Sequence, residues 1–178
     1  MGGESTSGSS IGLLDLDVLR TARADSLRTR EELDTLLSTE VGRYASEDTS
    51  LVVFGSLARG EWTSGSDLDW TYLIDAAASP AHAVIAHKIQ KFLKKNEKIF
   101  RPPGATGTFG NMAFSHDIIH QIGGPNDTNR NTTQRILLLL ESCAIGKRNE
   151  AHERVIRVVM DRYLDEDNNH LLTRDSKR

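Results

Sequence analysis

Two aspartates separated by a single residue are the part of this sequence with the clearest chemical potential. Asp67 and Asp69 would project from one face of an extended strand, which places their carboxylates close together. Two like charges ~4 Å apart repel by roughly 4 kcal/mol at an intermediate dielectric constant, and a bound divalent cation removes that cost. Carboxylate, phosphate and water oxygens are the ligands that Mg²⁺ prefers. The pair therefore predicts a site for Mg²⁺, or alternatively Mn²⁺, in which a hydroxyl is activated and a phosphate leaving group is stabilised.

A glycine–serine turn precedes the acid pair. The apolar, β-branched run Leu51–Phe54 is typical of a buried strand, and Gly55 ends it. Gly55 leaves no side chain between the backbone and an approaching phosphate, while Ser56 offers a hydroxyl and an amide. The turn can hold a polyphosphate if a helix begins there. Either feature alone is weak, because an isolated Asp-x-Asp is more typical of a surface hairpin with an Asx turn.

The segment 54–70 combines both features in a fixed order. Gly-Ser follows the strand, Arg-Gly-Glu comes next, and Ser-Asp-Leu-Asp enters a second strand. This order resembles the signature of the DNA polymerase beta-like nucleotidyltransferase superfamily, including the minimal nucleotidyltransferases of bacterial antitoxins. Residues 101–107 are similar to the Arg-Pro-x-Gly-x-x-Gly loop of the adenylyltransferase that modifies glutamine synthetase, which also has the Gly-Ser-Asp-Leu-Asp run found at 65–69. That family usually lacks the Gly-Ser turn and has two large catalytic halves, so the resemblance indicates the superfamily and leaves the substrate open.

The resemblance implies a fold, a reaction and a set of site residues. The fold is α+β (α/β), a mixed β-sheet flanked by helices, with helical N- and C-terminal extensions. The reaction is transfer of a nucleoside monophosphate, with ATP as the expected donor, to a hydroxyl of a protein or small molecule, with release of pyrophosphate. Asp67 and Asp69 would hold Mg²⁺. The residues that would contact the nucleotide are Gly55, Ser56, Arg59 and Ser66.

This superfamily uses a third acidic residue on a neighbouring strand, as a metal ligand or as the base for the attacking hydroxyl. Glu97 stands four residues before Arg101, where the adenylyltransferase has its acid, and we expect it on a strand. Asp117 follows the acid-then-apolar pattern of a third-acid strand, but a helix there would instead place His116 and His120 on one face. Both acids stay open as catalytic candidates, with Glu97 preferred. The two histidines could bind a transition metal, although a surface pair without a third ligand is the more common arrangement.

Three other side chains have a structural interpretation beside a functional one. Arg59 either contacts phosphate or pairs with Glu61 across Gly60 and stabilises the loop. Arg135 could reach the nucleotide from a C-terminal helix, but a solvated arginine behind a helix cap is the simpler interpretation. Cys143, the only cysteine, excludes an intrachain disulfide and is expected to be a buried structural thiol in a helix.

Hydrophobic spacing predicts the elements that would position these residues. Apolar residues recur at helical spacing from 13 to 45, which predicts one or two amphipathic helices. Residues 51–54 and 69–74 predict two strands that pair. A serine–proline pair at 79–80 predicts the cap and first turn of a helix that ends near residue 95. The remaining predictions are a loop over 101–110, a helix from 131 to 142 with Gly146 as its stop, a helix over 150–164 and a frayed tail after 165.

Length and composition bound the class of protein. With 178 residues, 38% of them hydrophobic and 26% charged, the chain fits one soluble cytoplasmic domain with an extension. We divide it into a flexible Gly/Ser-rich tail (1–10), a nucleotidyltransferase domain (11–125) and a C-terminal helical extension (126–178). The net charge of −3 argues against long nucleic acid as a partner, and no apolar run approaches the ~20 residues of a membrane span. A solvated helix face is expected to carry Lys88, Lys91, Lys94, Lys95 and Lys98.

Two functions from different classes fit these patterns. The first is the transferase described above, acting on a nucleoside triphosphate and an acceptor. The alternative is a nucleotide-binding regulatory or antitoxin-like module with weak or no catalysis. The intact pair of Asp67 and Asp69 favours the enzyme, whereas the open identity of the third acid favours the module. The chain could also be the N-terminal piece of a longer protein whose other part supplies the acceptor site.

Overall fold

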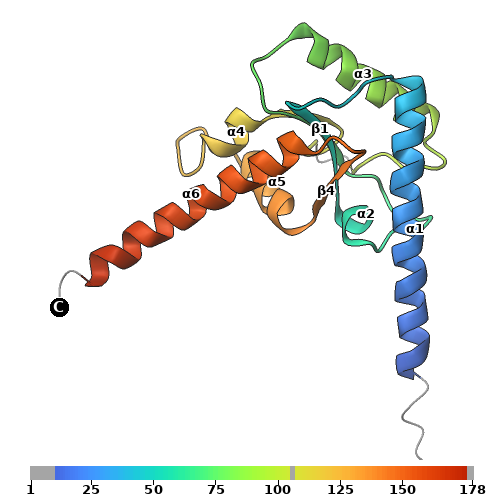
Figure 1. Ribbon diagram of the computed structural model, residues 1–178, viewed down its shortest axis with the longest axis horizontal. Helices are drawn as coiled ribbons and strands as arrows, with labels where there is room; N and C mark the ends of the chain where they lie inside the picture. Colours follow the sequence, from blue (N-terminus) through green and yellow to red (C-terminus); the bar gives the residue numbers. More distant parts are fainter. Residues whose placement is uncertain (1–10, 105–106, 176–178) are drawn as a thin grey trace, which may run out of the picture.

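The computed structural model describes residues 11–104 and 107–175, so the tail predicted over 1–10 lies outside the described residues. Helices and strands follow one another along the described chain without internal repetition (Figure 1). In chain order the elements are α1 (Ile11–Glu40), β1 (Thr49–Phe54), α2 (Gly55–Arg59), β2 (Trp70–Ile74), α3 (Pro80–Lys95), β3 (Asn111–Phe114), α4 (Ser115–Ile119), α5 (Asn129–Leu140), β4 (Ser142–Ile145) and α6 (Glu150–Asp175).

The strands form one mixed sheet in the order β3-β2-β1-β4. β1 runs antiparallel to β2, with Val52 opposite Thr71, and antiparallel to β4, with Leu51 opposite Ile145. β2 and β3 run parallel. The predicted pairing of the first two strands is confirmed, and so is the predicted fold class, a mixed sheet flanked by helices.

Helices cover both faces of the sheet, and the residues of each strand alternate between the two faces (Figure 1). Val53 of β1 belongs to a buried cluster with Leu37 of α1 and Ile89 of α3. The preceding residue, Val52, belongs to the cluster on the other face, together with Leu138 of α5. The sheet is therefore a middle layer between α1 and α3 on one side and α4, α5 and α6 on the other.

The first and third helices agree with the predictions. One continuous helix, α1, occupies most of the predicted range 13–45. The Ser79 hydroxyl caps α3 by accepting a hydrogen bond from the Ala81 amide at 3.3 Å, Pro80 stands in the first turn, and the helix ends at Lys95. The five lysines predicted on a solvated face are all exposed.

The helix predicted through Ser142 is wrong, because α5 ends at Leu140 and the next residues form β4. Every residue of β4 pairs with β1, and this non-local pairing outweighs the helical pattern of the local sequence. Cys143 therefore lies in a strand, half-buried, and not in a helix. β4 comes from the segment 126–178, so part of the predicted helical extension joins the central sheet, while the domain boundary at residue 125 stays a prediction.

Two further details of the elements differ from the predictions. Glu97 lies in a turn and not on a strand, because the Asn96 amide bonds to the carbonyl oxygens at the end of α3 and closes that helix. The predicted loop 101–110, by contrast, agrees with the structure, because its described residues are irregular apart from one bridge between Arg101 and Asp67. The predicted fraying after residue 165 is wrong, because α6 continues to Asp175.

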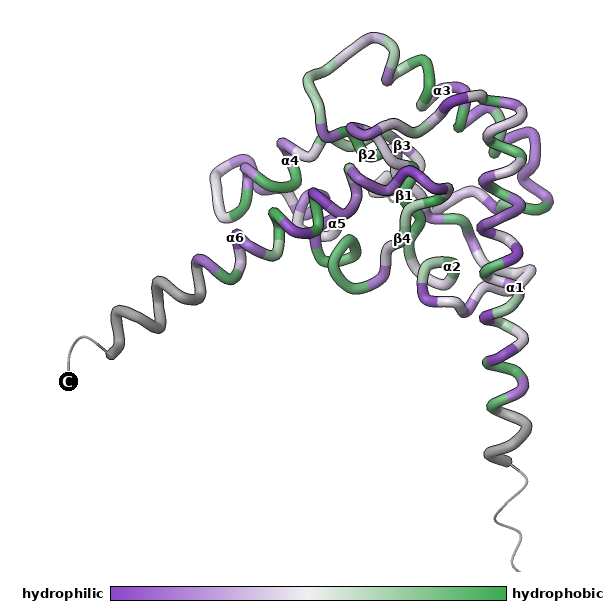
Figure 2. Tube along the Cα trace, viewed as in Figure 1, coloured by the Kyte–Doolittle hydropathy of each residue, from purple (hydrophilic) through white to green (hydrophobic). Residues whose placement is uncertain are grey.

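The longest helices, α1 and α6, extend away from the sheet in different directions (Figure 1). Hydrophilic and hydrophobic residues alternate along the coloured parts of both (Figure 2). In the described part of the chain, no helix combines the length and the apolar character that crossing a membrane requires.

Candidate active site

The residues of the predicted motif come together where β1 ends and β2 begins, at one end of the central strands. The amide of Phe54, the last residue of β1, donates a hydrogen bond to the carbonyl oxygen of Asp69 at 3.0 Å. The amide of Gly55 donates to the carbonyl oxygen of Glu141, just before β4, at 3.2 Å. Asp69, Gly55 and Glu141 therefore lie side by side, and the glycine turn meets the acid pair.

Gly55 is the point at which β1 turns into the short helix α2. Its φ of +64° lies in the left-handed region, which residues with a Cβ rarely adopt. A Cβ at this position would lie 3.9 Å from Asp69 Oδ2, so glycine also keeps the space above that carboxylate open. No side chain caps the first turn of α2, where Ser56 stands half-buried. The turn thus presents uncapped backbone beside an acidic side chain.

The two aspartates of the pair differ in their environment. Asp67 is exposed and Asp69 is half-buried, while Leu68 between them is buried in the cluster with α1 and α3. The aspartates consequently face the opposite side of the strand. Burial raises the pKa of the Asp69 carboxyl above its usual range, and the negative charges of Asp67 and Glu141 raise this pKa further. The site therefore contains an electrostatic cost that a bound cation would remove.

Arg59 and Ser66 both make contacts within the protein. The Arg59 guanidinium forms ion pairs with Glu61, with Nη2 and Oε2 2.8 Å apart, and with Glu141. The predicted Arg59–Glu61 pair is present, and Glu141 is a partner that was not predicted. The Ser66 hydroxyl accepts a hydrogen bond from the Thr63 amide at 3.1 Å, which closes the loop before the acid pair. Contacts of Arg59 and Ser66 with a nucleotide stay predictions.

Comparison with protein families decides the class of this site. Residues 30–103 match the family model described as a nucleotidyltransferase domain, and the match covers β1, α2, β2 and α3 with the glycine turn and the acid pair. This segment of the chain is therefore similar to a nucleotidyltransferase domain. The match confirms the resemblance to the polymerase beta-like superfamily and supports nucleoside monophosphate transfer as the general reaction. Comparison with curated proteins found no match, and comparison with solved structures found none either.

The two predicted third acids lie away from the acid pair of the nucleotidyltransferase domain. Glu97 lines a cavity together with Leu68 and Trp70, on the face of β2 opposite to the aspartates. Asp117 is exposed on α4, which follows β3 at the far end of β2. The structure therefore brings neither residue to the pair, and their catalytic roles stay predictions.

Glu141 is the acid that the structure places beside Asp69, and sequence reasoning missed it. Its carboxylate is engaged by Arg59, and within the described residues no three His, Cys, Asp or Glu side chains gather closely enough to hold a metal. Glu141 lies outside the matched segment 30–103. The sequence contains only a weak indication of a role for Glu141, because it is a single acid between the apolar end of a helix and the short apolar run Cys143–Ile145.

The remaining candidates of the C-terminal half have structural contacts. Arg135 is only 1% exposed, and its guanidinium bonds to the Asp127 carboxylate at 2.5 Å and to the Tyr163 hydroxyl at 3.1 Å. The interpretation of Arg135 as a solvated arginine is therefore wrong, since it joins α5 to α6 inside the protein. His116 lies on α4 and His120 is the C-cap of that helix, with their ring centroids 4.9 Å apart, which confirms the helical alternative for that segment.

Proposed function

We propose that this chain transfers a nucleoside monophosphate, AMP from ATP, to a hydroxyl group of a protein or small molecule, with release of pyrophosphate and with Mg²⁺ as its cofactor. The observation that supports the proposal most strongly is the position of the glycine turn directly beside Asp69, inside a nucleotidyltransferase domain. A fold alone does not imply a reaction, so the proposed reaction must follow from what this site can bind and stabilise.

The turn at Gly55 and Ser56 is suited to the triphosphate. The absence of a Cβ at Gly55 allows phosphate oxygens to approach the backbone closely. The first turn of α2 lacks a side-chain cap, so its amides can donate to phosphate, and the Ser56 hydroxyl adds one more donor. The triphosphate would then extend toward the aspartates on the adjacent strand.

The acid pair fits Mg²⁺ or Mn²⁺. Mg²⁺ is commonly bound through one or two carboxylates together with substrate phosphates and water, and Asp67 and Asp69 provide two carboxylates. The raised pKa of Asp69 supports the fit, because a cation would offset the neighbouring negative charges that cause part of the shift. When bound, the ion would stabilise negative charge on the transferred phosphate and on the pyrophosphate.

The transfer requires one bond to form, one bond to break and one proton to move. The acceptor oxygen bonds to the α-phosphorus, and the bond from that phosphorus to the oxygen bridging the β-phosphate breaks, so pyrophosphate leaves with the electron pair. A carboxylate base takes the hydroxyl proton. Glu141 is the best-placed acid once Arg59 releases it, and Arg59 would then be free to contact phosphate. Glu97 and Asp117 would need a rearrangement to serve instead.

Pyrophosphate release tests the proposal directly. The purified chain would be incubated with ATP, Mg²⁺ and hydroxyl-bearing fractions of a cell extract. Asp67→Asn and Asp69→Asn should each reduce the rate roughly 100-fold or more, because each removes a carboxylate that would hold the Mg²⁺ needed to stabilise negative charge on the reacting phosphate. Asp161→Asn, at an exposed aspartate on α6, is the matched control and should keep the rate of the parent.

Two outcomes would contradict this function. If the Asp67→Asn and Asp69→Asn variants release pyrophosphate as fast as the parent, the acid pair is not the active site. If ATP binds tightly but no acceptor fraction supports pyrophosphate release, the chain is a nucleotide-binding module. The module is not favoured at present, because the matched family model describes a nucleotidyltransferase domain.

A further inference from the structure

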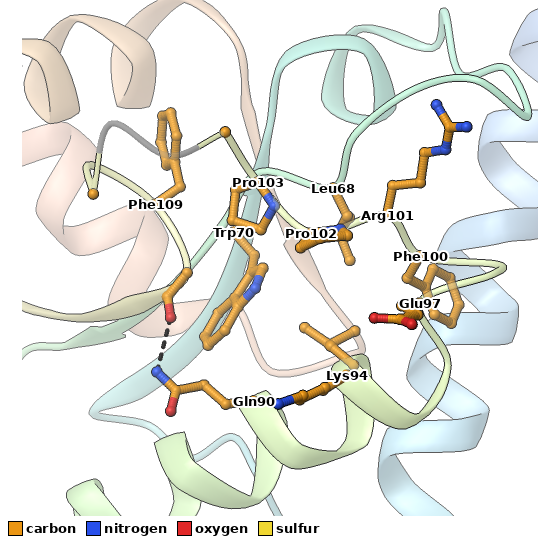
Figure 3. Close-up of a pocket in the computed structure, with 14 residues that line it drawn as sticks. Leu68, Trp70, Gln90, Lys94, Glu97, Phe100, Arg101, Pro102, Pro103 and Phe109 are labelled. Atoms are coloured by element: carbon orange, nitrogen blue, oxygen red, sulfur yellow. Dashed lines mark hydrogen bonds between the residues drawn. The ribbon is translucent and has the colours of Figure 1, made fainter.

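A cavity of about 440 Å³ lies on the face of β2 that is turned away from Asp67 and Asp69 (Figure 3). Leu68 and Trp70 form part of its wall, and they alternate along the chain with the two aspartates. Its volume falls in the range of small-ligand sites, about 300–1,000 Å³. The segment from Asp67 to Trp70 therefore has the proposed nucleotide site on one face and this separate cavity on the other.

Most of the side chains that line this cavity are apolar, and several of them present a flat ring to it. Leu93 and Phe100 contribute from the end of α3 and the turn after it, and Pro102 and Pro103 contribute from the following loop. Trp70 supplies a further aromatic face from β2 (Figure 3). Flat apolar faces around a cavity of this size favour a planar ring over an extended chain.

Two polar groups face the open space of the cavity. Trp70 is only 2% exposed, yet its indole nitrogen faces that space (Figure 3). Among the lining residues drawn in Figure 3, the hydrogen bond runs from Gln90 Nε2 to the Gly110 carbonyl oxygen at 2.9 Å, and none runs from the indole N–H. The Glu97 carboxylate points toward the same space from the opposite wall. A ligand that carries an acceptor could bond to the indole N–H, and a donor on the same ligand could bond to Glu97.

We infer that this cavity binds a planar nitrogen heterocycle that carries an exocyclic amino group. A ring nitrogen would accept a hydrogen bond from the Trp70 indole, and the amino group would donate one to Glu97. The ring itself would pack between Phe100 and the flat face of Pro103. The combination of one donor, the Trp70 indole, with one acceptor, Glu97, matches the acceptor and the donor of such a base, and Lys94 and Arg101 also line the cavity. The inference does not depend on the proposed transferase activity.

Adenine is a suitable probe, and the tryptophan indoles report its binding. The chain contains two tryptophans, so a sample labelled with ¹⁵N gives two indole N–H signals, which Trp62→Phe assigns. Titration with adenine should shift the Trp70 signal and leave the Trp62 signal in place. Glu97→Gln should weaken binding roughly tenfold, the effect of losing a hydrogen bond to a charged group. Glu32→Gln, an exposed glutamate on α1, is the matched control and should leave the affinity unchanged.

A double variant separates this site from the nucleotide site. Asp67→Asn combined with Asp69→Asn should lose Mg²⁺-dependent ATP binding and keep the adenine-induced shift of Trp70. The inference is overturned if adenine leaves the Trp70 signal unchanged, if Glu97→Gln binds adenine as tightly as the parent, or if the double variant abolishes the shift. Because Glu97 is exposed, its substitution should leave the spectrum otherwise folded.

Discussion

At the residue scale, the ionised carboxylate of Asp69 lowers the stability of the folded protein. Its pKa is raised in the folded protein, so folding disfavours the ionised carboxylate relative to the unfolded chain. The stabilisation from this group is fully present below its unfolded pKa and is lost as the pH rises through the folded pKa. Asp69→Asn cannot ionise, and we therefore expect it to raise the thermal midpoint at pH 7 in the absence of metal. The gain should disappear in acid, as thermal unfolding measured across the pH range will show.

The comparison with Asp67→Asn provides the control for this prediction. Asp67 is exposed, and the same substitution there should change the midpoint less than it does at Asp69. If Asp69→Asn lowers the midpoint at pH 7, the carboxylate is stabilised in the folded protein and the argument from burial and repulsion is wrong.

The raised pKa also sets the pH dependence of metal and nucleotide binding. A protonated Asp69 is a poor cation ligand, so affinity for Mg²⁺ and ATP should fall as the pH decreases through the raised pKa. The fall should begin at a higher pH than for an ordinary carboxyl. Calorimetric titration with ATP and excess Mg²⁺ at several pH values measures it. An affinity that stays constant down to the usual carboxyl range would exclude Asp69 as the titrating ligand.

At the element scale, the turn from β1 into α2 requires a left-handed residue. Gly55→Ala should destabilise the protein by roughly 1–2 kcal/mol, the cost of placing a Cβ residue in that conformation. Gly104→Ala is the matched control, because a Cβ there would meet none of the described residues within 4 Å and its φ is not in the left-handed region. Urea unfolding compares the two variants. Equal stability of Gly55→Ala and the parent would show that the turn tolerates a side chain.

The same scale shows what the sequence could predict. β1, β2 and α3 follow from local signals: apolar runs, a serine cap and a proline in the first turn. β4 could not be predicted in this way, because only its pairing with β1 makes Ser142–Ile145 a strand. Glu141 was missed for the same reason, since its approach to Asp69 depends on that pairing. The turn at Glu97 also depends on context, because it closes α3 before the chain returns to β2.

At the scale of the whole molecule, the candidate site depends on helices far from it in the sequence. α5 leads directly into Glu141 and β4, and Leu138 of α5 is 3% exposed in the cluster beneath the sheet. Leu138→Ala should therefore reduce the free energy of unfolding by about 2–5 kcal/mol. Leu140→Ala, two residues on and 77% exposed, should change it by less than about 0.5 kcal/mol. Similar losses in both variants would show that this layer does not support the sheet.

The segment that contains the acid pair and enters β2 has a different candidate site on each of its two faces. One face carries the aspartates beside the glycine turn, and the other carries Leu68 and Trp70 against the cavity below α3.

A crystal structure with Mn²⁺ and α,β-methylene ATP tests the central assignment most directly. We predict anomalous density for Mn²⁺ between Asp67 and Asp69, with the triphosphate at the turn formed by Gly55. Metal and triphosphate bound elsewhere, with both aspartates free of ligands, would contradict the account.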